Sequence, residues 1–123
     1  MTVRVEREGA LALVTLARPE RLNALTPEMM EQLADATAAL QQDRGVRAVL
    51  LRGEGRAFCS GADVGTMTGL DVLSGRQRIQ RAHRVIAGLA NMDKPVIAAV
   101  RGAAVGVGWS LALACDLILA SEN

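Results

Sequence analysis

Apolar residues in this chain recur with period two in some segments and with helical spacing in others. Period-two alternation covers residues 2–7 and 10–16, and the Glu8-Gly9 pair between them is typical of a hairpin turn. Helical spacing follows, and the two patterns then succeed one another toward the C-terminus. A chain of 123 residues with this succession is predicted to fold as one α/β unit, in which right-handed crossovers connect parallel strands.

Local residues mark where the helices begin and which faces they bury. Thr26 suits an N-cap and Pro27 suits the first helical position, so a helix is predicted from there to Gly45. A second predicted helix has one apolar face, while its other faces carry arginines that we expect to be solvated. The apolar face holds Ile79, Ala82, Ile86 and Leu89, and the arginines are Arg76, Arg78, Arg81 and Arg84.

The remaining segments predict three strands, a loop and a short helix. Two of these strands are mostly apolar and are predicted to be buried, as is typical of a parallel sheet. The strands are 46–51, 95–100 and 116–120, of which the last two are the buried type; the glycine-rich loop is 101–108 and the helical run is 109–115.

Composition and charge exclude several classes of protein. The net charge of +1 and the two aromatic residues, Phe58 and Trp109, provide no basic stacking surface for nucleic acid. So few aromatics also mean that the core must be built from Ala, Val, Leu and Ile. The longest apolar stretch, residues 102–115, would span roughly 21 Å as a helix, short of the ~30 Å hydrocarbon core, so no membrane span is predicted.

Neither the cysteines nor the start of the chain indicates export. Cys59 and Cys115 lack the spacing of a zinc site or a redox pair, so we expect two reduced thiols. The charged, alternating first residues do not resemble a signal or transit peptide. These features favour a cytoplasmic protein without a bound metal.

Two junctions between a strand and a helix could bind an anion through backbone N–H groups. In the first, three glycines at positions 102, 106 and 108 do not fit the dinucleotide or P-loop patterns. Glycines can still turn an N–H outward at a helix N-terminus, which makes an anion or oxyanion site; a tight packing turn is the alternative. The second junction is 60–64, where Asp63 is either an N-cap or an acid–base group. One inward-facing amide from each junction could hold a single developing oxyanion.

Ser110 lies in a segment that approximates the Gly-x-Ser-x-Gly turn of hydrolases. The one histidine, His83, precedes this serine, whereas in that fold the histidine follows it. We therefore expect no Ser–His triad, and His83 is expected to be packed against a neighbour or solvated.

Five segments of the sequence form a recognisable series: 18–25 (RPERLNAL), 46–51 (VRAVLL), 55–63 (GRAFCSGAD), 94–100 (KPVIAAV) and 111–116 (LALACD). In this order they resemble the enoyl-CoA hydratase/isomerase (crotonase) family. The resemblance implies an α/β fold built as a crotonase-like spiral of ββα units. Because family chains are longer, residues 1–123 would form the N-terminal portion of an acyl-CoA-binding core, with no second domain in this chain.

The resemblance also implies which residues act. In the family, the backbone N–H groups of the residues that match Ala62 and Val107 form an oxyanion hole for the thioester carbonyl of an acyl-CoA. Polarising this carbonyl acidifies the α-carbon and stabilises an enolate. The matching contacts with coenzyme A are Arg18, Arg21, Leu22, Ala24, Ser60, Ala62, Asp63, Val64, Gly65 and Gly106.

The same resemblance implies the partners of the protein. The two arginines, Arg18 and Arg21, are expected to meet phosphates of coenzyme A. Coenzyme A would be part of the substrate, and no other cofactor and no metal is implied. The expected assembly is a homo-oligomer, a trimer or a hexamer.

Two positions depart from the pattern of the family's hydratases. Val107 stands where they have glycine, and its branched Cβ disfavours positive φ, so the hole could be shaped differently. Ser110 stands where they have glutamate, which removes one of the two carboxylates that hydration uses. We therefore favour double-bond or ring isomerisation, with an enoyl-CoA hydratase (a lyase) as the first alternative. The second alternative is a non-catalytic CoA-binding fragment or pseudoenzyme, and the 123-residue chain alone is expected to be inactive.

Overall fold

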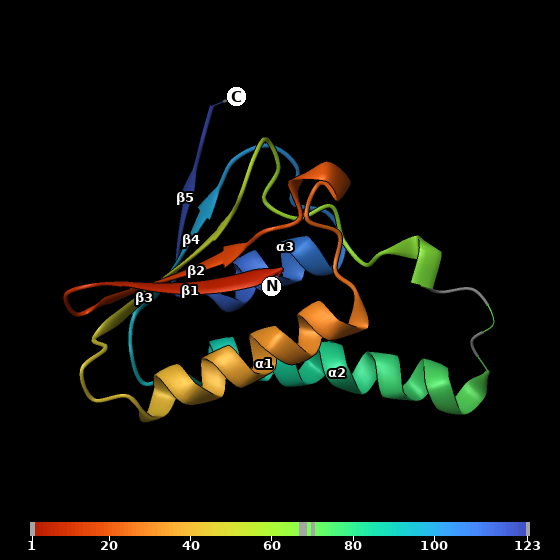
Figure 1. Cartoon of the computed structure of the whole chain (residues 1–123), viewed down its shortest axis with the longest axis horizontal. Helices are drawn as coiled ribbons and strands as arrows, with labels where there is room; N and C mark the ends of the chain where they lie inside the picture. The colour runs from red at the N-terminus through yellow and green to blue at the C-terminus, as the bar shows by residue number, and fades with distance from the viewer. Residues whose placement is uncertain (1, 67–68, 70, 123) are drawn as a thin grey trace.

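Five strands form a single sheet in the order in which they occur along the chain (Figure 1). The computed structural model describes residues 2–66, 69 and 71–122. The first two strands pair antiparallel as the predicted hairpin, and the others extend the sheet in parallel. The strands are β1 (Val3–Glu8), β2 (Leu11–Leu16), β3 (Ala48–Gly53), β4 (Val96–Val100) and β5 (Leu117–Ala120).

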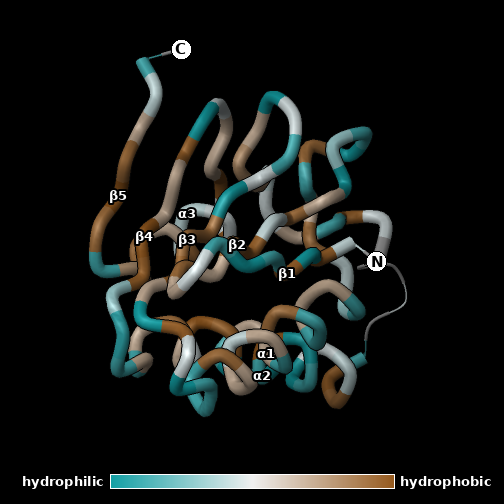
Figure 2. The backbone as a smooth tube through the Cα atoms, turned by 60° about the vertical axis from the view of Figure 1, so that its left-hand side comes forward, coloured by the Kyte–Doolittle hydropathy of each residue, from teal (hydrophilic) through white to brown (hydrophobic). Residues whose placement is uncertain are grey.

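Within these residues, three α-helices connect the parallel strands. They are α1 (Pro27–Gln42), α2 (Val72–Ala90) and α3 (Val107–Ala114), accompanied by two short 3-10 helices, η1 (Pro19–Arg21) and η2 (Val64–Thr66). α1 and α2 lie side by side beneath the sheet in both views (Figures 1 and 2). α3 begins two residues earlier than the sequence predicted. No helix in the described part of the chain has both the length and the apolar character needed to cross a bilayer.

The predicted N-cap of α1 is confirmed. Oγ1 of Thr26 accepts a hydrogen bond from the N–H of Met29 at 3.1 Å, and proline occupies the first turn. At the other end, the ammonium group of Lys94 donates to the carbonyl oxygens of Leu40 and Asp43. A positive charge therefore lies at the negative end of the helix, and it fixes α1 to the start of β4.

Each of the strands β2, β3 and β4 is followed by a short strand-like segment and then by a helix. β2 leads through Leu25 into α1, β3 leads through residues 59–62 into α2, and β4 leads through Ala104 into α3. The short segments pair with one another in parallel, Leu25 with Ala62 and Cys59 with Ala104. This repeated strand, bridge and helix is the predicted spiral of ββα units, and the α/β fold class is confirmed.

The core lies between the sheet and the helices and consists almost wholly of aliphatic side chains. Val49 and Leu51 of β3 are fully buried, and Phe58 is the largest buried side chain. Met29 and Met30 of α1 are also buried, whereas none of the isoleucines is among the buried residues. The predicted core composition is thus confirmed for Ala, Val and Leu, while among the isoleucines Ile86 packs against this core as a partly buried residue.

Three predictions about exposure are wrong. Arg78, expected in solvent, is 8% exposed because α2 packs it against the loop after β3, where its guanidinium reaches Asp63. Ile79, expected on the buried face of α2, is 57% exposed. β5, expected as a buried strand, is exposed at all four residues, because it lies at the edge of the sheet, next to β4. Figure 2 shows this apolar strand at the rim of the sheet.

Candidate functional site

The loop that follows β3 is held against the segment before α1 by a short parallel pairing. Leu25 donates its N–H to the carbonyl of Gly61 at 2.8 Å and accepts the N–H of Asp63 at 2.9 Å. Because successive residues of an extended strand turn their backbone groups to opposite sides, the N–H of Ala62 faces away from Leu25. Within the described residues, this N–H has no hydrogen-bond acceptor.

The loop that follows β4 turns into α3 at Gly106. Gly106 has a φ of 58° and directly precedes Val107, the first helical residue. The N–H groups of Gly108 and Trp109 are satisfied by the carbonyls of Val105 and Gly106. The N–H of Val107, in contrast, has no acceptor in the part of the chain that the structure describes. It belongs to the free N–H groups of a helix N-terminus, where the helix dipole adds partial positive charge.

These two loops touch one another at their glycines. A Cβ atom at Gly61 would lie 3.1 Å from the carbonyl oxygen of Val105, and one at Gly106 would lie 4.0 Å from the Cα of Gly61. Ala62 and Val107 are the next residues along the two loops. The structure therefore places Ala62 and Val107, the two residues that the resemblance implies, on adjoining loops.

Val107 does not adopt a positive φ. Its branched side chain, which disfavours positive φ, therefore does not distort the backbone at this position. Among the described residues, positive φ outside glycine occurs at Leu22 and Asn23. The left-handed positions of the loop before α3 are Gly102 and Gly106, with φ of 67° and 58°. Val107 begins an ordinary helix, so its amide is presented without backbone strain.

Arg18 and Asp63 form a partly buried ion pair beside Ala62. Nη1 of Arg18 lies 2.7 Å from Oδ2 of Asp63 and also donates to the carbonyl of Ala24 at 3.0 Å. The hydrogen bond from Arg18, followed by one from the N–H of Gly65, lowers the pKa of Asp63 below its ordinary value. Asp63 is therefore a carboxylate that caps the start of η2, one of its two predicted roles, and its charge is already compensated.

The sequence analysis assigned no role to Asn23, although its side chain links the segment before α1 to the loop after β3. It is fully buried; Oδ1 accepts the N–H of Arg18 at 2.8 Å, and Nδ2 donates to the carbonyls of Glu54 and Ala57, each at 2.9 Å. Its φ of 57° is one that asparagine tolerates better than most residues. A single polar amide between leucines, at 22–25, was the sequence signal that could have indicated this turn.

The other predicted contact residues lie on the same loops or next to them. Arg21 and Val64 are exposed, the latter at 77%, and the hydroxyl of Ser60 donates to the carbonyl of Arg21 at 3.4 Å. Ser110 is exposed in α3, and its hydroxyl donates at 3.4 Å to the carbonyl of the residue before that helix. Segments 18–25, 58–65 and 104–110 thus meet beyond the carboxyl ends of β2, β3 and β4, where ligands of parallel sheets commonly bind.

Both cysteines are thiols in apolar surroundings, and neither is suited to be a nucleophile. Burial raises the pKa of Cys59, and burial together with the carboxylate of Asp116 raises the pKa of Cys115 to about 12. At pH 8 about one part in 10⁴ of Cys115 would be the reactive thiolate. We expect the folded protein to resist iodoacetamide at pH 8 and the denatured protein to react at both thiols, as measured by mass spectrometry. Rapid alkylation of the folded chain would contradict these environments.

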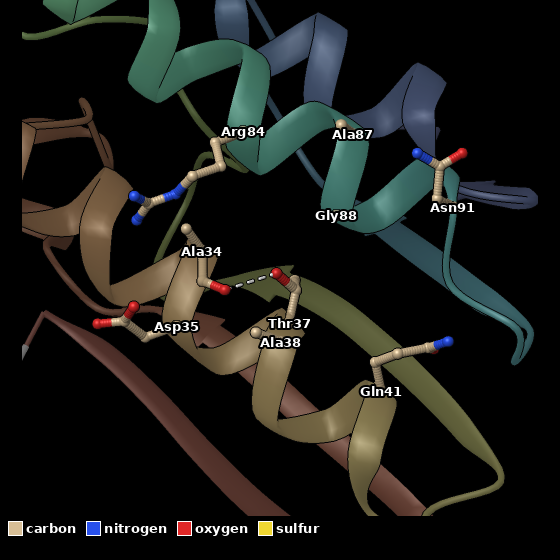
Figure 3. A pocket seen from close by; sticks show the side chains of 9 residues that line it. All are labelled: Ala34, Asp35, Thr37, Ala38, Gln41, Arg84, Ala87, Gly88 and Asn91. Atoms are coloured by element: carbon tan, nitrogen blue, oxygen red, sulfur yellow. Dashed lines mark hydrogen bonds between the residues drawn. The ribbon is translucent and has the colours of Figure 1, made fainter.

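A hollow of about 530 Å³ lies elsewhere, between α1 and α2 (Figure 3). Small side chains line it from both helices, including Ala34 and Ala38 on one side and Ala87 and Gly88 on the other. It shares no residue with the loops that carry the two amides. No three His, Cys, Asp or Glu side chains cluster as metal ligands in residues 2–66, 69 and 71–122. The amide pair is therefore the candidate site.

Three comparisons with known proteins point to one family. The family model described as enoyl-CoA hydratase/isomerase matches residues 6–123. A "Probable enoyl-CoA hydratase" of Rhizobium meliloti (strain 1021) is 44% identical over 125 residues, which cover 99% of this chain and 47% of the relative. The "Short-chain-enoyl-CoA hydratase" of Clostridium acetobutylicum is 38% identical over 120 residues, covering 97% and 46%. The crystal structure of an enoyl-CoA hydratase from Bacillus anthracis superimposes with a TM-score of 0.95 at 28% identity, covering 100% and 48%.

The chain spans slightly less than half the length of these relatives. Within that span, the resemblance carried by five short segments extends over nearly every residue, and the solved structure has the same fold. The chain belongs to the enoyl-CoA hydratase/isomerase family.

Proposed function

We propose that the N–H groups of Ala62 and Val107 form an oxyanion hole for the thioester carbonyl of an acyl-CoA. The observation that carries this proposal is a pair of amides on adjoining loops, neither with an acceptor among the described residues. One amide is fixed by the pairing with Leu25 and the other by the start of α3, so both are oriented before a substrate arrives. Such donors bind a developing enolate oxygen more strongly than a neutral carbonyl, which lowers the barrier to loss of the α-proton.

The coenzyme A part of the substrate is proposed to lie along segments 18–25 and 60–65. Arg21 is exposed within the first of these segments and is the arginine better placed for a phosphate. Arg18 is more restricted, because its Nη1 already bonds to Asp63 and Ala24. Coenzyme A enters as part of the substrate, and the proposed chemistry needs no further cofactor.

For the whole protein we propose isomerisation rather than hydration. Adding water across an enoyl-CoA uses two carboxylates around one water, whereas a proton shift can be run by a single acid–base group. In segments 58–66 and 101–110 the one acid is Asp63, which is paired with Arg18. Ser110 presents a hydroxyl from α3 instead of a carboxylate.

Enoyl-CoA hydration is the second candidate, because the relatives that are 44% and 38% identical to this chain are named hydratases. It would need carboxylates from outside the two loops. In either case a homo-oligomer, a trimer or a hexamer, acting in the cytoplasm is the proposed setting.

Butyryl-CoA labelled with ¹³C at the thioester carbonyl tests the proposed hole directly. Two N–H donors withdraw electron density from the carbonyl, so we expect its resonance to move downfield when the ligand binds the 123-residue chain. CoA itself, added in excess as a competitor, should return the resonance to its free position. A bound complex whose carbonyl resonance is unchanged would remove the oxyanion assignment.

The chain alone is expected to convert no crotonyl-CoA into 3-hydroxybutyryl-CoA, because the two loops provide no second carboxylate. Chromatography of the reaction mixture against a no-protein blank measures this. Robust hydration by the pure chain would contradict the argument that Ser110, in place of a carboxylate, disfavours hydration. Enoyl-CoA hydration would then become the preferred function.

A further inference from the structure

We propose that the ion pair between Arg18 and Asp63 is a positioning device that sets the direction of the Ala62 N–H toward the thioester oxygen. The inference rests on the proposed oxyanion hole and deepens it. Neither side chain has to touch the reacting atoms, so both are positioning residues.

Asp63 shares a peptide plane with Ala62 and is held at several of its groups. Its Oδ2 lies 2.7 Å from Nη1 of Arg18, and its own N–H donates to the carbonyl of Leu25 at 2.9 Å. Its carbonyl oxygen lies 3.4 Å from Nη2 of Arg78, a buried arginine of α2. With these bonds in place, the peptide planes on either side of Asp63 have little freedom to rotate. The Ala62 N–H lies in the preceding plane, 61–62, whose Gly61 carbonyl accepts the N–H of Leu25. Holding Gly61 on one side and Asp63 on the other therefore restricts the direction of the Ala62 N–H.

Arg18 fastens the opposite side of the same pairing. The Nη1 atom that bonds to Asp63 also donates to the carbonyl of Ala24, the residue before Leu25. One guanidinium nitrogen therefore joins the residue before Leu25 to the residue after Ala62. Here the two segments form a single isolated bridge rather than a long ladder. Because so few backbone hydrogen bonds hold such a short pairing, side-chain hydrogen bonds are needed to stabilise it.

The pair also decides the charge beside the hole. The two side chains are 18% and 19% exposed, so they are less screened by salt than a surface pair. A carboxylate without its arginine, one residue from the Ala62 amide, would repel a developing enolate. Arg18 compensates that charge while it fixes the backbone, so losing Arg18 should weaken the hydrogen bond to the thioester oxygen through both effects. Losing Asp63 should weaken it through the backbone alone.

The test compares two ligands that differ at one oxygen. Butyryl-CoA has the thioester carbonyl, and S-butyl-CoA is the thioether without it, so the ratio of their affinities isolates the carbonyl bonds and cancels any phosphate contact of Arg18. We expect the 123-residue chain to prefer the thioester, and Arg18→Gln and Asp63→Asn each to reduce that preference about fivefold, the size of one or two ordinary hydrogen bonds. Arg18→Lys should keep most of it, because one nitrogen makes both native bonds.

A second ion pair of the chain provides a matched control. Nη1 of Arg7 lies 2.7 Å from Oδ2 of Asp43, the same atoms at the same distance, between β1 and the end of α1. Arg7→Gln and Asp43→Asn should keep the wild-type preference. If Arg18→Gln and Asp63→Asn lower the melting temperature but leave the ratio as in wild type, the pair is only structural and the inference is wrong. If the wild-type chain itself shows no thioester preference, the proposed hole has failed, and the positioning role falls with it.

Discussion

Replacing Ala62 by Pro is expected to lower the whole protein's turnover of acyl-CoA thioesters at least a hundredfold. Proline has no N–H, so one of the two proposed donors is lost, and losing one such donor typically costs about 2.7–4 kcal/mol of transition-state stabilisation. Because the hydrogen bond strengthens as the enolate forms, kcat should fall far more than KM rises. Steady-state kinetics with a 3-enoyl-CoA and its 2-enoyl isomer measure both constants.

The fold gives a reason why this change should act on chemistry more than on stability. The pairing of this loop uses the carbonyl of Gly61 and the N–H of Asp63, both bonded to Leu25, and does not use the N–H of Ala62. Ala62→Gly, which keeps the N–H, is the matched control and should retain most of the activity. A proline ring also restricts Gly61 before it, so an ester in place of the 61–62 amide is the second variant. An unchanged turnover rate in that ester variant would show that the N–H of Ala62 is not a donor of the oxyanion hole.

Elements that depend on neighbouring residues could be predicted from the sequence. The hairpin follows from period-two alternation around Gly9, and α1 follows from Thr26 and Pro27, whose capping bond is present in the structure. The two amide-bearing loops were predicted at the right positions for the same reason, because each is a glycine-containing junction between a strand and a helix. In each of these cases the residues that decide the structure are adjacent in the chain.

What the sequence missed depends on contacts between distant segments. The burial of Arg78 results from the loop after β3 folding over α2, and the exposure of β5 results from its place at the edge of the sheet. Whether the N–H of Ala62 is left without an acceptor depends on the register between the two paired segments. Leu25 pairs with Ala62 and so bonds to the residues on either side of it, and a shift by one residue would have consumed the amide. No periodicity within either segment determines that register.

Gly108→Ala is expected to destabilise the chain by about 3 kcal/mol or more, at the upper end of what overpacking costs. Gly108 lies in the first turn of α3, and a Cβ there would overlap the carbonyl oxygen of Cys59 and lie 2.9 Å from its Cβ. The obstacle is backbone of the neighbouring loop, which cannot rotate away as a flexible side chain can. Urea unfolding followed by circular dichroism measures the change.

Gly75→Ala is the control that makes this result specific, because Gly75 is also a helical glycine and no atom of the described residues lies within 4 Å of an added Cβ. There alanine should stabilise by roughly 0.5–1 kcal/mol through helix propensity and a less flexible unfolded chain. Changes of opposite sign in the free energy of unfolding at two helical glycines would show that the close approach of α3 to Cys59, and not glycine content as such, determines the effect. Gly108 follows Val107 directly, and Cys59 lies three residues before Ala62, so a shift at this contact would move the two amides relative to one another. We therefore expect any Gly108→Ala protein that still folds to lose its preference for the thioester over the thioether. Equally small changes in the free energy of unfolding at both positions would contradict the close contact between Gly108 and Cys59. They would also contradict the argument that this contact holds the two amide-bearing loops together.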